Sequence, residues 1–202
     1  MILCCMNKKN VSALILVAGI SKRMKMLKAF LAFDDKTTFF GKIVNTYISW
    51  GCREIVVVTN KQFNDSFDWS HKLAHQLTFV TNDHIHYERF YSIKTGLNAM
   101  KDTDFCFLQN IDNPFVNHQI LDQLYLNRTN DAYVVPVYKH KGGHPILLNK
   151  KSISHVKTYI ENSANLREVL GELNSKRVVV DDESVLVNIN NPEEYRELIE
   201  LK

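Results

Sequence analysis

The sequence predicts an α/β fold in which a mostly parallel, mixed sheet lies between two layers of helices. Short apolar runs of strand length alternate along the chain with segments whose apolar residues recur at helical spacing. The first run, residues 13–17, is apolar at every position, as expected for a strand that is buried on both faces. Because this alternation is typical of a sheet covered by helices on both sides, we expect a three-layer α/β/α sandwich.

The N-terminal part of the chain predicts a strand–helix–strand unit. The second strand is expected at residues 54–59, which are dense in β-branched side chains. Between the two strands, Thr37 or Thr38 can cap a helix and Gly51 can end it. The apolar residues at helical spacing are Phe39, Phe40, Ile43, Val44, Tyr47 and Ile48.

The alternation continues through the middle of the chain. Residues 65–76 predict a weak helix, and residues 77–80 a short strand. A second helix is expected to begin near Ser92. Residues 105–109 form another apolar run, and the helix that follows has Asn117 as its predicted cap.

The C-terminal part predicts further strands and two helices. The expected strands are residues 132–138, 145–148, 177–180 and 185–187. Residues 141–143 predict the turn between the first two of these strands, and residues 166–173 predict a helix. The last helix has Asn191 as its cap and Pro192 in its first turn.

Length and composition indicate one globular domain over residues 1–202, with residues 1–10 expected to fray. The chain is 45% hydrophobic and 23% charged, with a net charge of +3. This small charge gives no case for nucleic acid or an anionic membrane as a partner, and no apolar run reaches the length of a membrane span. The four cysteines form no C-x-x-C pair, which favours free thiols and a cytoplasmic location. The oligomeric state stays open between a monomer and a homodimer.

A basic loop follows the first predicted strand, at the edge of the sheet where ligands bind in folds of this class. Gly19 allows the backbone to approach a ligand, and the Ser21 hydroxyl and nearby amide groups can contact phosphate oxygens. The loop also carries the cations Lys22, Arg23, Lys25 and Lys28. It matches neither the phosphate loop that ends in Gly-Lys-Ser/Thr nor the Gly-x-Gly-x-x-Gly of dinucleotide folds. Its composition fits a polyphosphate site and, equally, a solvated basic turn.

Two further polar segments follow strands at the same edge. Asp112 lies in the turn 110–114, and a carboxylate there suits Mg²⁺, which binds few carboxylates together with phosphate oxygens. The simpler interpretation is a turn former or a helix cap. Asn188 and Asn190 follow the last predicted strand, directly before the Asn191 cap, and can equally be polar loop residues.

Four other side chains are weaker candidates. His144 lies beside two glycines and either reaches the site or is a turn residue before a strand. Tyr87, Phe90 and Tyr91 can line an acceptor pocket, although packing in the core is the commoner role of aromatic side chains.

Residues 16–24, together with Lys28, resemble a nucleotide-binding motif. The motif is the Leu-x-Ala-Gly-x-Ser-x-Arg-Met-Gly-x-x-Lys of the molybdenum-cofactor cytidylyltransferase group, which belongs to the nucleotidyltransferases with a glycosyltransferase-A-like sheet. Four later segments are similar to other motifs of this family in the same order: 92–97, 112–114, 143–145 and 188–194. The resemblance runs from Ala13 to Leu198, which is most of the chain.

The resemblance implies a fold, a ligand and a set of site residues. It implies the nucleotidyltransferase form of the α/β sandwich, with a nucleoside triphosphate as substrate. Ala18 favours CTP, because family members that use guanine tend to have Gly there. The implied nucleotide-binding residues are Leu16, Ala18, Gly19, Ser21, Arg23, Lys28 and Ser92. Mg²⁺ is implied on Asp112 and Asn190, and catalytic roles are implied for Arg23, Lys28 and Asp112.

The implied reaction transfers a nucleotidyl group to a phosphorylated small molecule such as molybdopterin and releases pyrophosphate. A sugar, alditol or other small-molecule phosphate is the alternative acceptor, for a cytidylyl- or uridylyltransferase. The chain departs from the motif at Lys25 and Ile111, where the family has Gly, and at Asn188 and Asn190, where it has Asp. Since neutral ligands weaken a metal site, a nucleotide-binding accessory protein with reduced turnover is a further alternative.

Overall fold

A computed structural model describes residues 10–19, 24 and 26–200 of the chain. Ser21 and Arg23, together with residues 1–9 of the expected frayed end, lie outside the described residues. No helix in the described part of the chain is both long and apolar enough to cross a membrane.

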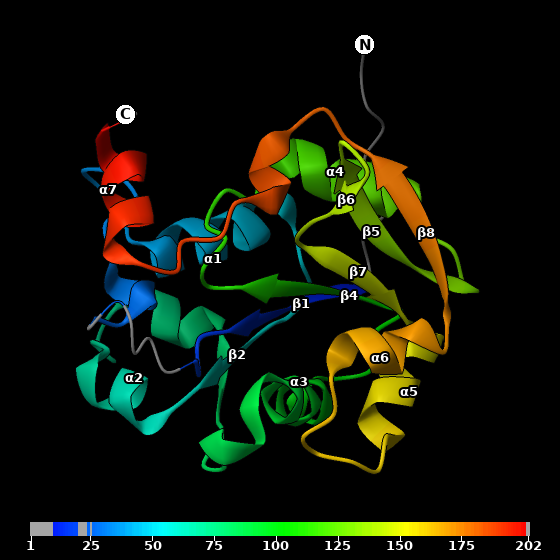
Figure 1. Cartoon of the computed structure of the whole chain (residues 1–202). Helices are drawn as coiled ribbons and strands as arrows, with labels where there is room; N and C mark the ends of the chain where they lie inside the picture. The colour runs from blue at the N-terminus through cyan, green and yellow to red at the C-terminus, as the bar shows by residue number, and fades with distance from the viewer. Residues whose placement is uncertain (1–9, 20–23, 25, 201–202) are drawn as a thin grey trace.

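The core of the molecule is a mixed sheet in the order β3-β2-β1-β4-β7-β5-β6, with β8 paired to β5 (Figure 1). Its strands are β1 (Val11–Leu16), β2 (Ile55–Thr59), β3 (Thr78–Thr81), β4 (Phe105–Asn110), β5 (Ala132–Tyr138), β6 (Lys141–Gly142), β7 (Ile146–Asn149) and β8 (Asn174–Val179). The pairs β1–β2, β1–β4, β2–β3 and β5–β8 are parallel. Among the strands of the described residues, β7 pairs antiparallel with β4 and β5, and β6 pairs antiparallel with β5. This confirms the predicted mostly parallel, mixed sheet.

Helices cover both faces of the sheet and complete the three layers. They are α1 (Phe39–Trp50), α2 (Lys61–Ser66), α3 (Glu88–Ala99), α4 (His118–Leu126), α5 (Lys150–Thr158), α6 (Leu166–Gly171) and α7 (Pro192–Glu200). Short 3₁₀ helices lie at η1 (Lys28–Phe30), η2 (Lys72–Gln76), η3 (Ile85–Tyr87) and η4 (Glu183–Leu186). Figure 1 shows α1 and α4 on one side of the sheet and α3, α5 and α6 on the other.

Strand β1 explains how the two hydrophobic cores form. Ala13 and Ile15 belong to the core that α1, α4 and α7 cover, whereas Leu14 and Leu16 belong to the core under α3, α5 and α6. Successive side chains of a strand point to opposite faces, so a strand inside the sheet must be apolar throughout. The continuous run that predicted this strand is therefore the direct result of burial on both faces.

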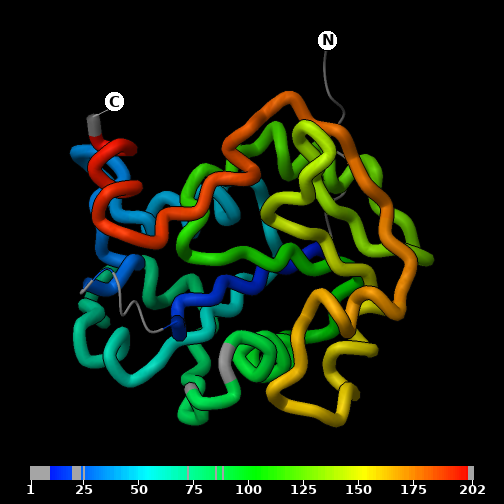
Figure 2. Tube along the Cα trace, viewed as in Figure 1, coloured from blue at the N-terminus to red at the C-terminus, as the bar shows by residue number. Residues whose placement is uncertain are grey.

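The C-terminal helix packs against the first helix in the first core. Helix α7 lies beside α1 (Figure 2), and the rings of Phe39 and Tyr195 are 5.9 Å apart. The Tyr195 hydroxyl also donates to the carbonyl of Ala32. These contacts fix the C-terminal segment next to the residues that follow β1.

Several predicted helix boundaries are confirmed by their capping hydrogen bonds. Thr38, and not Thr37, caps α1 by accepting from the Gly41 amide, and Gly51 ends the helix with a φ of 95°. Asn117 accepts from the Ile120 amide at the start of α4. Asn191 accepts from the amide of Glu194 in the first turn of α7.

Two predicted helices begin elsewhere, and one helix was missed. The predicted helix 65–76 is wrong: α2 begins after the Asn60 cap and ends at Ser66, before the separate 3₁₀ helix η2. Helix α3 begins at Glu88, before Ser92. Helix α5 was not predicted, although Asn149 caps it by accepting from the amide of Ser152.

Two predictions near the C-terminus are corrected in a way that matters for the site. Residues 185–187 do not form a strand, because Asp182 caps the 3₁₀ helix η4 there by accepting from the Ser184 amide. The turn predicted at 141–143 lies instead at Lys139 and His140, which adopt φ angles of 44° and 68°. Strand β6 takes up most of the predicted turn.

Candidate active site

Polar residues meet where the parallel strands end. Leu16, the last residue of β1, pairs with Asn110, the last residue of β4, so the loops after both strands leave the sheet side by side. Ligands bind in folds of this class at that carboxyl edge. The loop after β1 leads to Lys28, and the turn after β4 contains Asp112.

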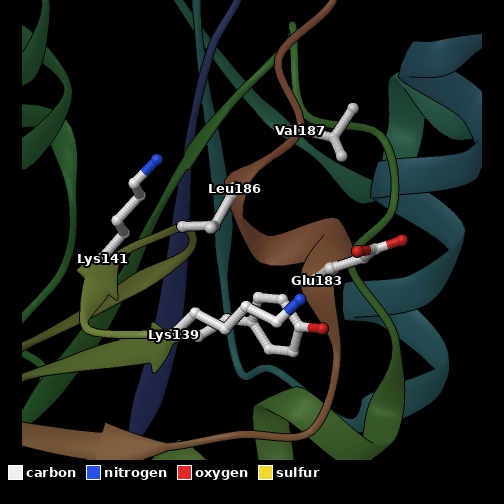
Figure 3. A pocket seen from close by; sticks show the side chains of 6 residues that line it. Lys139, Lys141, Glu183, Leu186 and Val187 are labelled. Atoms are coloured by element: carbon white, nitrogen blue, oxygen red, sulfur yellow. The ribbon is translucent and has the colours of Figure 1, made fainter.

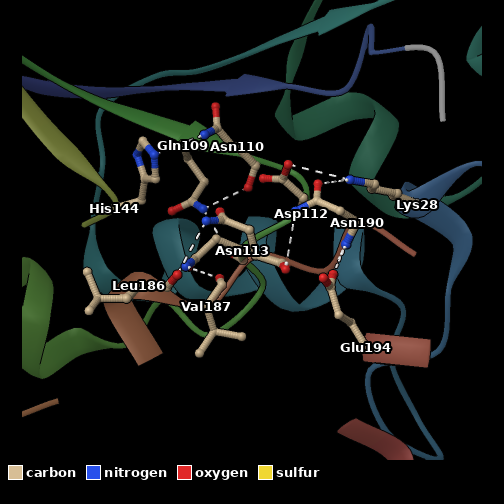
Figure 4. Close-up of polar contacts among 11 residues, drawn as sticks. Lys28, Gln109, Asn110, Asp112, Asn113, His144, Leu186, Val187, Asn190 and Glu194 are labelled. Atoms are coloured by element: carbon tan, nitrogen blue, oxygen red, sulfur yellow. Dashed lines mark hydrogen bonds and ion pairs between the residues drawn. The ribbon is translucent and has the colours of Figure 1, made fainter. Parts of the chain in front are cut away.

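Lys28 lies between two oxygen-bearing side chains from distant parts of the chain (Figure 4). Its Nζ donates to Asn190 Oδ1 at 2.9 Å and lies 3.5 Å from Asp112 Oδ2. The Lys28 side chain is only 12% exposed, and Asp112 is 26% exposed. Three of the predicted site residues therefore form one partly buried cluster.

The Asp112 turn is held by main-chain contacts with the segment before α7. The Asp112 carbonyl accepts from the amide of Ile189 at 2.8 Å. The neighbouring Asn113 donates through Nδ2 to the carbonyls of Ser184 and Val187, at 3.0 and 2.6 Å. A buried amide with both partners satisfied is a rigid anchor, so the turn and this segment move as one unit.

Asn190 is fixed by the start of α7. Its amide donates to Glu194 Oε2 at 2.5 Å, while the Glu194 amide donates to the cap residue Asn191. This pattern resembles a capping box, in which side chains satisfy the free amides of a helix start. The same contacts that begin α7 thus hold Asn190 facing Lys28.

Two buried polar atoms at this edge have no hydrogen-bond partner among the described residues: Asp112 Oδ1 and His144 Nδ1. The other ring nitrogen of His144 lies 3.4 Å from Asn110 Nδ2. An amide nitrogen only donates, so this contact requires Nε2 to accept and places the proton on Nδ1. The site therefore presents a free acceptor and a free donor, which is what a bound substrate would satisfy.

The electrostatic environment keeps His144 neutral. The pKa of His144 is lowered to about 4, chiefly by burial and also by the positive charge of Arg89, while the negative charge of Asp112 opposes the shift. The charges of Arg89 and Asp112 also act on one another. Near pH 7 the imidazole is a hydrogen-bonding group and not a cation, while Arg89 supplies positive charge from the start of α3.

The remaining predicted nucleotide-binding residues lie around the first strand and α3. The side chains of Leu16 and Ala18 are buried in the core under α3, so only their backbone groups can face a ligand. The Ala18 carbonyl already accepts from Asn60 Nδ2. Ser92 is buried and its hydroxyl accepts from Asn82 Nδ2, at the end of β3. Phe90 packs in the core, which agrees with the alternative interpretation of this side chain as a core residue and not as part of an acceptor pocket.

Gly19 differs from the other residues of this loop. A Cβ added there would meet no described atom within 4 Å, and its φ is not in the left-handed region. The fold itself therefore does not require glycine. None of the described residues fills the space beside its backbone.

Sequence reasoning did not assign roles to Arg89, Asn110, Asn113 and Glu194. Asn110 and Asn113 flank Asp112, and their position directly after a buried strand was the available signal. The role of Glu194 was hidden because an acidic residue in the first turn of a helix is usually explained by the helix dipole. Within the described residues, no group of three or more His, Cys, Asp or Glu side chains is placed to hold a metal ion.

Comparisons with known proteins identify relatives of this chain. The chain is 28% identical over 204 residues to the protein named "Probable molybdenum cofactor guanylyltransferase" of Natranaerobius thermophilus, covering 93% of this chain and 94% of that protein. It is 25% identical over 137 residues to the 2-C-methyl-D-erythritol 4-phosphate cytidylyltransferase of Fusobacterium nucleatum. That match spans 64% of this chain and 58% of the Fusobacterium protein.

Solved structures share the fold. Rv0371c from Mycobacterium tuberculosis superposes with a TM-score of 0.79 at 19% identity, covering 95% of this chain and 99% of that one. Molybdopterin-guanine dinucleotide biosynthesis protein A from Archaeoglobus fulgidus gives a TM-score of 0.69 at 18% identity, with 94% and 97% covered. The family model for the MobA-like NTP transferase domain matches residues 13–178. The chain belongs to the MobA-like NTP transferase family.

Proposed function

We propose that this chain transfers a nucleotidyl group from CTP to the phosphate of a small-molecule acceptor and releases pyrophosphate, with Mg²⁺ as its cofactor. The observation that carries the proposal is the position of the Lys28 ammonium group, between Asp112 and Asn190 at the carboxyl edge of the sheet. A cation, a carboxylate and an amide oxygen at this edge can hold a triphosphate and a metal ion together.

The proposed step is an in-line displacement at the α-phosphorus of the nucleotide. An oxygen of the acceptor phosphate forms the new bond to that phosphorus, and the bond to the pyrophosphate oxygen breaks with its electron pair. The acceptor phosphate is already anionic, so no protein group has to remove a proton. The chain contributes by holding the two phosphates in line and by placing the Lys28 charge near the leaving oxygens.

Asp112 and Asn190 fit the oxygen ligands of Mg²⁺. Asp112 Oδ1 is buried without a hydrogen-bond partner among the described residues, and Asn190 Oδ1 faces the same Lys28 ammonium group. Mg²⁺ commonly binds one or two carboxylates and completes its shell with water and substrate phosphates. When bound, the ion would neutralise negative charge on the phosphates. Rv0371c, which shares the fold, has been solved in complex with manganese.

The choice of CTP rests on Ala18. The two relatives divide on the base: the Natranaerobius protein is named for guanylyl transfer and the Fusobacterium protein for cytidylyl transfer. Their names also support the two acceptor classes that the sequence left open. Molybdopterin is the first candidate acceptor, since the relative named for it covers nearly the whole chain. A sugar or alditol phosphate is the second.

Pyrophosphate release tests the proposal. Each of CTP, GTP, UTP and ATP is offered with Mg²⁺ and a panel of phosphorylated acceptors that includes molybdopterin. We expect release with CTP to exceed release with the other nucleotides. A preference for GTP would show that the choice of CTP is wrong, while the proposed reaction would stand. Thermal stabilisation by CTP and Mg²⁺ without pyrophosphate release from any acceptor would instead identify a nucleotide-binding accessory protein.

A further inference from the structure

A pocket of about 320 Å³ lies between the end of β5, β6 and the segment that contains η4 (Figure 3). Its lining combines apolar and charged side chains: Tyr138, Lys139, Lys141, Glu183, Leu186 and Val187. This volume is at the small end of the range for pockets that hold small molecules. None of these residues has a role in the proposed reaction.

The pocket lies at the same edge of the sheet as Asp112. Strands β4 and β5 both run antiparallel to β7, so they are parallel to one another and end at the same edge. Asn110 is the last residue of β4 and Tyr138 is the last residue of β5. The end of β5 and the Asp112 turn therefore lie at the same edge of the sheet.

The pocket and the Asp112 turn share a wall. Residues 183–187 line the pocket, and Asn113, next to Asp112, donates to the carbonyls of Ser184 and Val187. The amide of His144 donates to the carbonyl of Val185 in the same segment, at 2.8 Å. These hydrogen bonds connect the pocket wall to residues of the candidate active site and so fix its position relative to Asp112.

The lining gives the pocket an excess of positive charge. It carries two ammonium groups, on Lys139 and Lys141, against the single carboxylate of Glu183. No ion pair joins either lysine to a carboxylate of the described residues. The lining also includes the apolar side chains of Leu186 and Val187, of which Val187 is 37% exposed. This combination suits an anionic group carried on an apolar body.

The turn that carries Lys139 has a defined backbone conformation. Lys139 and His140 both adopt left-handed backbone angles, as the two-residue turn of the β5–β6 hairpin requires. Arg177 of β8 donates through Nη2 to the His140 carbonyl at 2.8 Å and holds this conformation.

We propose that this pocket binds a second acidic group of the acceptor, separated from the reacting phosphate by an apolar body. The inference rests on the proposed function for the identity of the ligand as an acceptor. It narrows the acceptor class to molecules with two acidic groups and so disfavours the simple sugar and alditol phosphates of the second candidate class. An acceptor whose only acidic group is the reacting phosphate leaves the two lysines unused.

The test compares acceptor analogues in a binding experiment that does not depend on turnover. The probes are glycerol 1-phosphate, with one acidic group, 3-phosphoglycerate, which adds a carboxylate, and 1,3-propanediol bisphosphate, which adds a phosphate. Binding of each to the full chain is measured by calorimetry in the presence of CTP and Mg²⁺. The variant is Lys139→Ala/Lys141→Ala. The control is Lys101→Ala/Lys151→Ala, which removes the same charge from exposed positions at the opposite edge of the sheet.

We expect the probes with two acidic groups to bind the unaltered chain and the control roughly tenfold more tightly than glycerol 1-phosphate. The pocket variant is expected to lose this preference and to bind CTP as before. The stronger of the two diacidic probes shows whether the pocket takes a phosphate or a carboxylate. Equal binding of all three probes to the unaltered chain, or no binding of any, overturns the proposal. So does a preference that survives in the pocket variant.

Pyrophosphate release separates this proposal from the proposed function. If the chain releases pyrophosphate and the pocket variant keeps the diacidic preference, the pocket inference is wrong and the reaction stands. If no nucleotide and acceptor yield pyrophosphate but the preference depends on Lys139 and Lys141, the pocket is an anion site and the proposed function is wrong.

Discussion

The ammonium group of Lys28 donates a 2.9 Å hydrogen bond to the side-chain oxygen of Asn190, which lies 162 residues further along the chain. The same group is 3.5 Å from the Asp112 carboxylate. Lys28 begins a 3₁₀ helix after β1, Asp112 follows β4, and Asn190 precedes α7. Because the positive charge of Lys28 balances the negative charge of Asp112 and Asn190 is neutral, the three side chains form a cluster without net charge.

The first prediction concerns Lys28. Lys28→Ala removes the only cation in this cluster among the described residues, so the rate of pyrophosphate release is expected to fall roughly 100- to 1000-fold. The fold is expected to remain intact, since the aliphatic stem can be lost without opening either hydrophobic core. Steady-state kinetics and a thermal melt check both parts. The exposed Lys61→Ala serves as the control. An unchanged rate in Lys28→Ala would contradict the assigned site.

The second prediction concerns the neutral amide at the proposed metal position. Asn190→Asp adds a second carboxylate beside Asp112, and added ligand charge tightens the binding of a divalent cation. We expect the Mg²⁺ concentration for half-maximal activity to fall roughly tenfold. Asn165→Asp adds the same charge at the cap of α6, where an aspartate also accepts from the Arg167 amide. Equal Mg²⁺ requirements in both variants would exclude Asn190 as a ligand.

The third prediction separates two glycines by their surroundings. Gly19→Ala meets no described atom, so it is expected to leave the stability unchanged and to weaken binding of CTP. Gly143→Ala would bring a Cβ to 2.4 Å from the Val185 carbonyl oxygen, so it is expected to destabilise the fold by about 1–3 kcal/mol. Urea unfolding and CTP titration of both variants check this. Loss of stability in Gly19→Ala would show that the fold, and not a ligand, requires that glycine.

The sequence predicts those parts of the fold whose pattern is set locally. The runs at 13–17 and 105–109 predict strands correctly because a buried inner strand must be apolar on both faces, which needs no knowledge of its neighbours. Thr38, Asn117 and Asn191 predict helix starts for the same reason, since a cap and its amide are only a few residues apart.

The wrong predictions concern residues whose structure depends on distant contacts. Residues 185–187 have the composition of a strand, yet the Val185 carbonyl accepts from the amide of His144 and lies against Gly143. Gly143 suggested a turn, whereas it is needed for this close approach. The turn itself lies at Lys139 and His140, held by Arg177 from another strand.

The candidate site follows the same division. Lys28 and Asp112 could be predicted because they follow the strands β1 and β4, and strand ends meet at one edge of a parallel sheet. Asn190 was predicted from the family resemblance, since the segment before it is the 3₁₀ helix η4 and not the expected strand. The coupling of Arg89 to His144 and Asp112 could not be predicted, because α3 approaches the turn after β4 only in the folded molecule. The anchoring of Asn190 by Glu194 was likewise invisible in the sequence.

The last prediction concerns His144 and the dependence of stability on pH. Burial and Arg89 lower its pKa in the folded state to about 4, against an ordinary value of about 6.5 in the unfolded chain. Between these values the unfolded state binds more protons than the folded state, so the free energy of unfolding rises with pH across this window. On acidification from about pH 6.5 to about pH 4, His144 is expected to cost the fold up to about 3 kcal/mol. The asparagine in His144→Asn is not protonated in this pH range, so the variant does not lose this part of the free energy of unfolding. Urea unfolding of both proteins at a series of pH values measures the difference between their unfolding free energies, which is expected to shift in favour of the variant as the pH falls. A difference that is constant with pH would mean that the folded protein does not hold His144 in its neutral form.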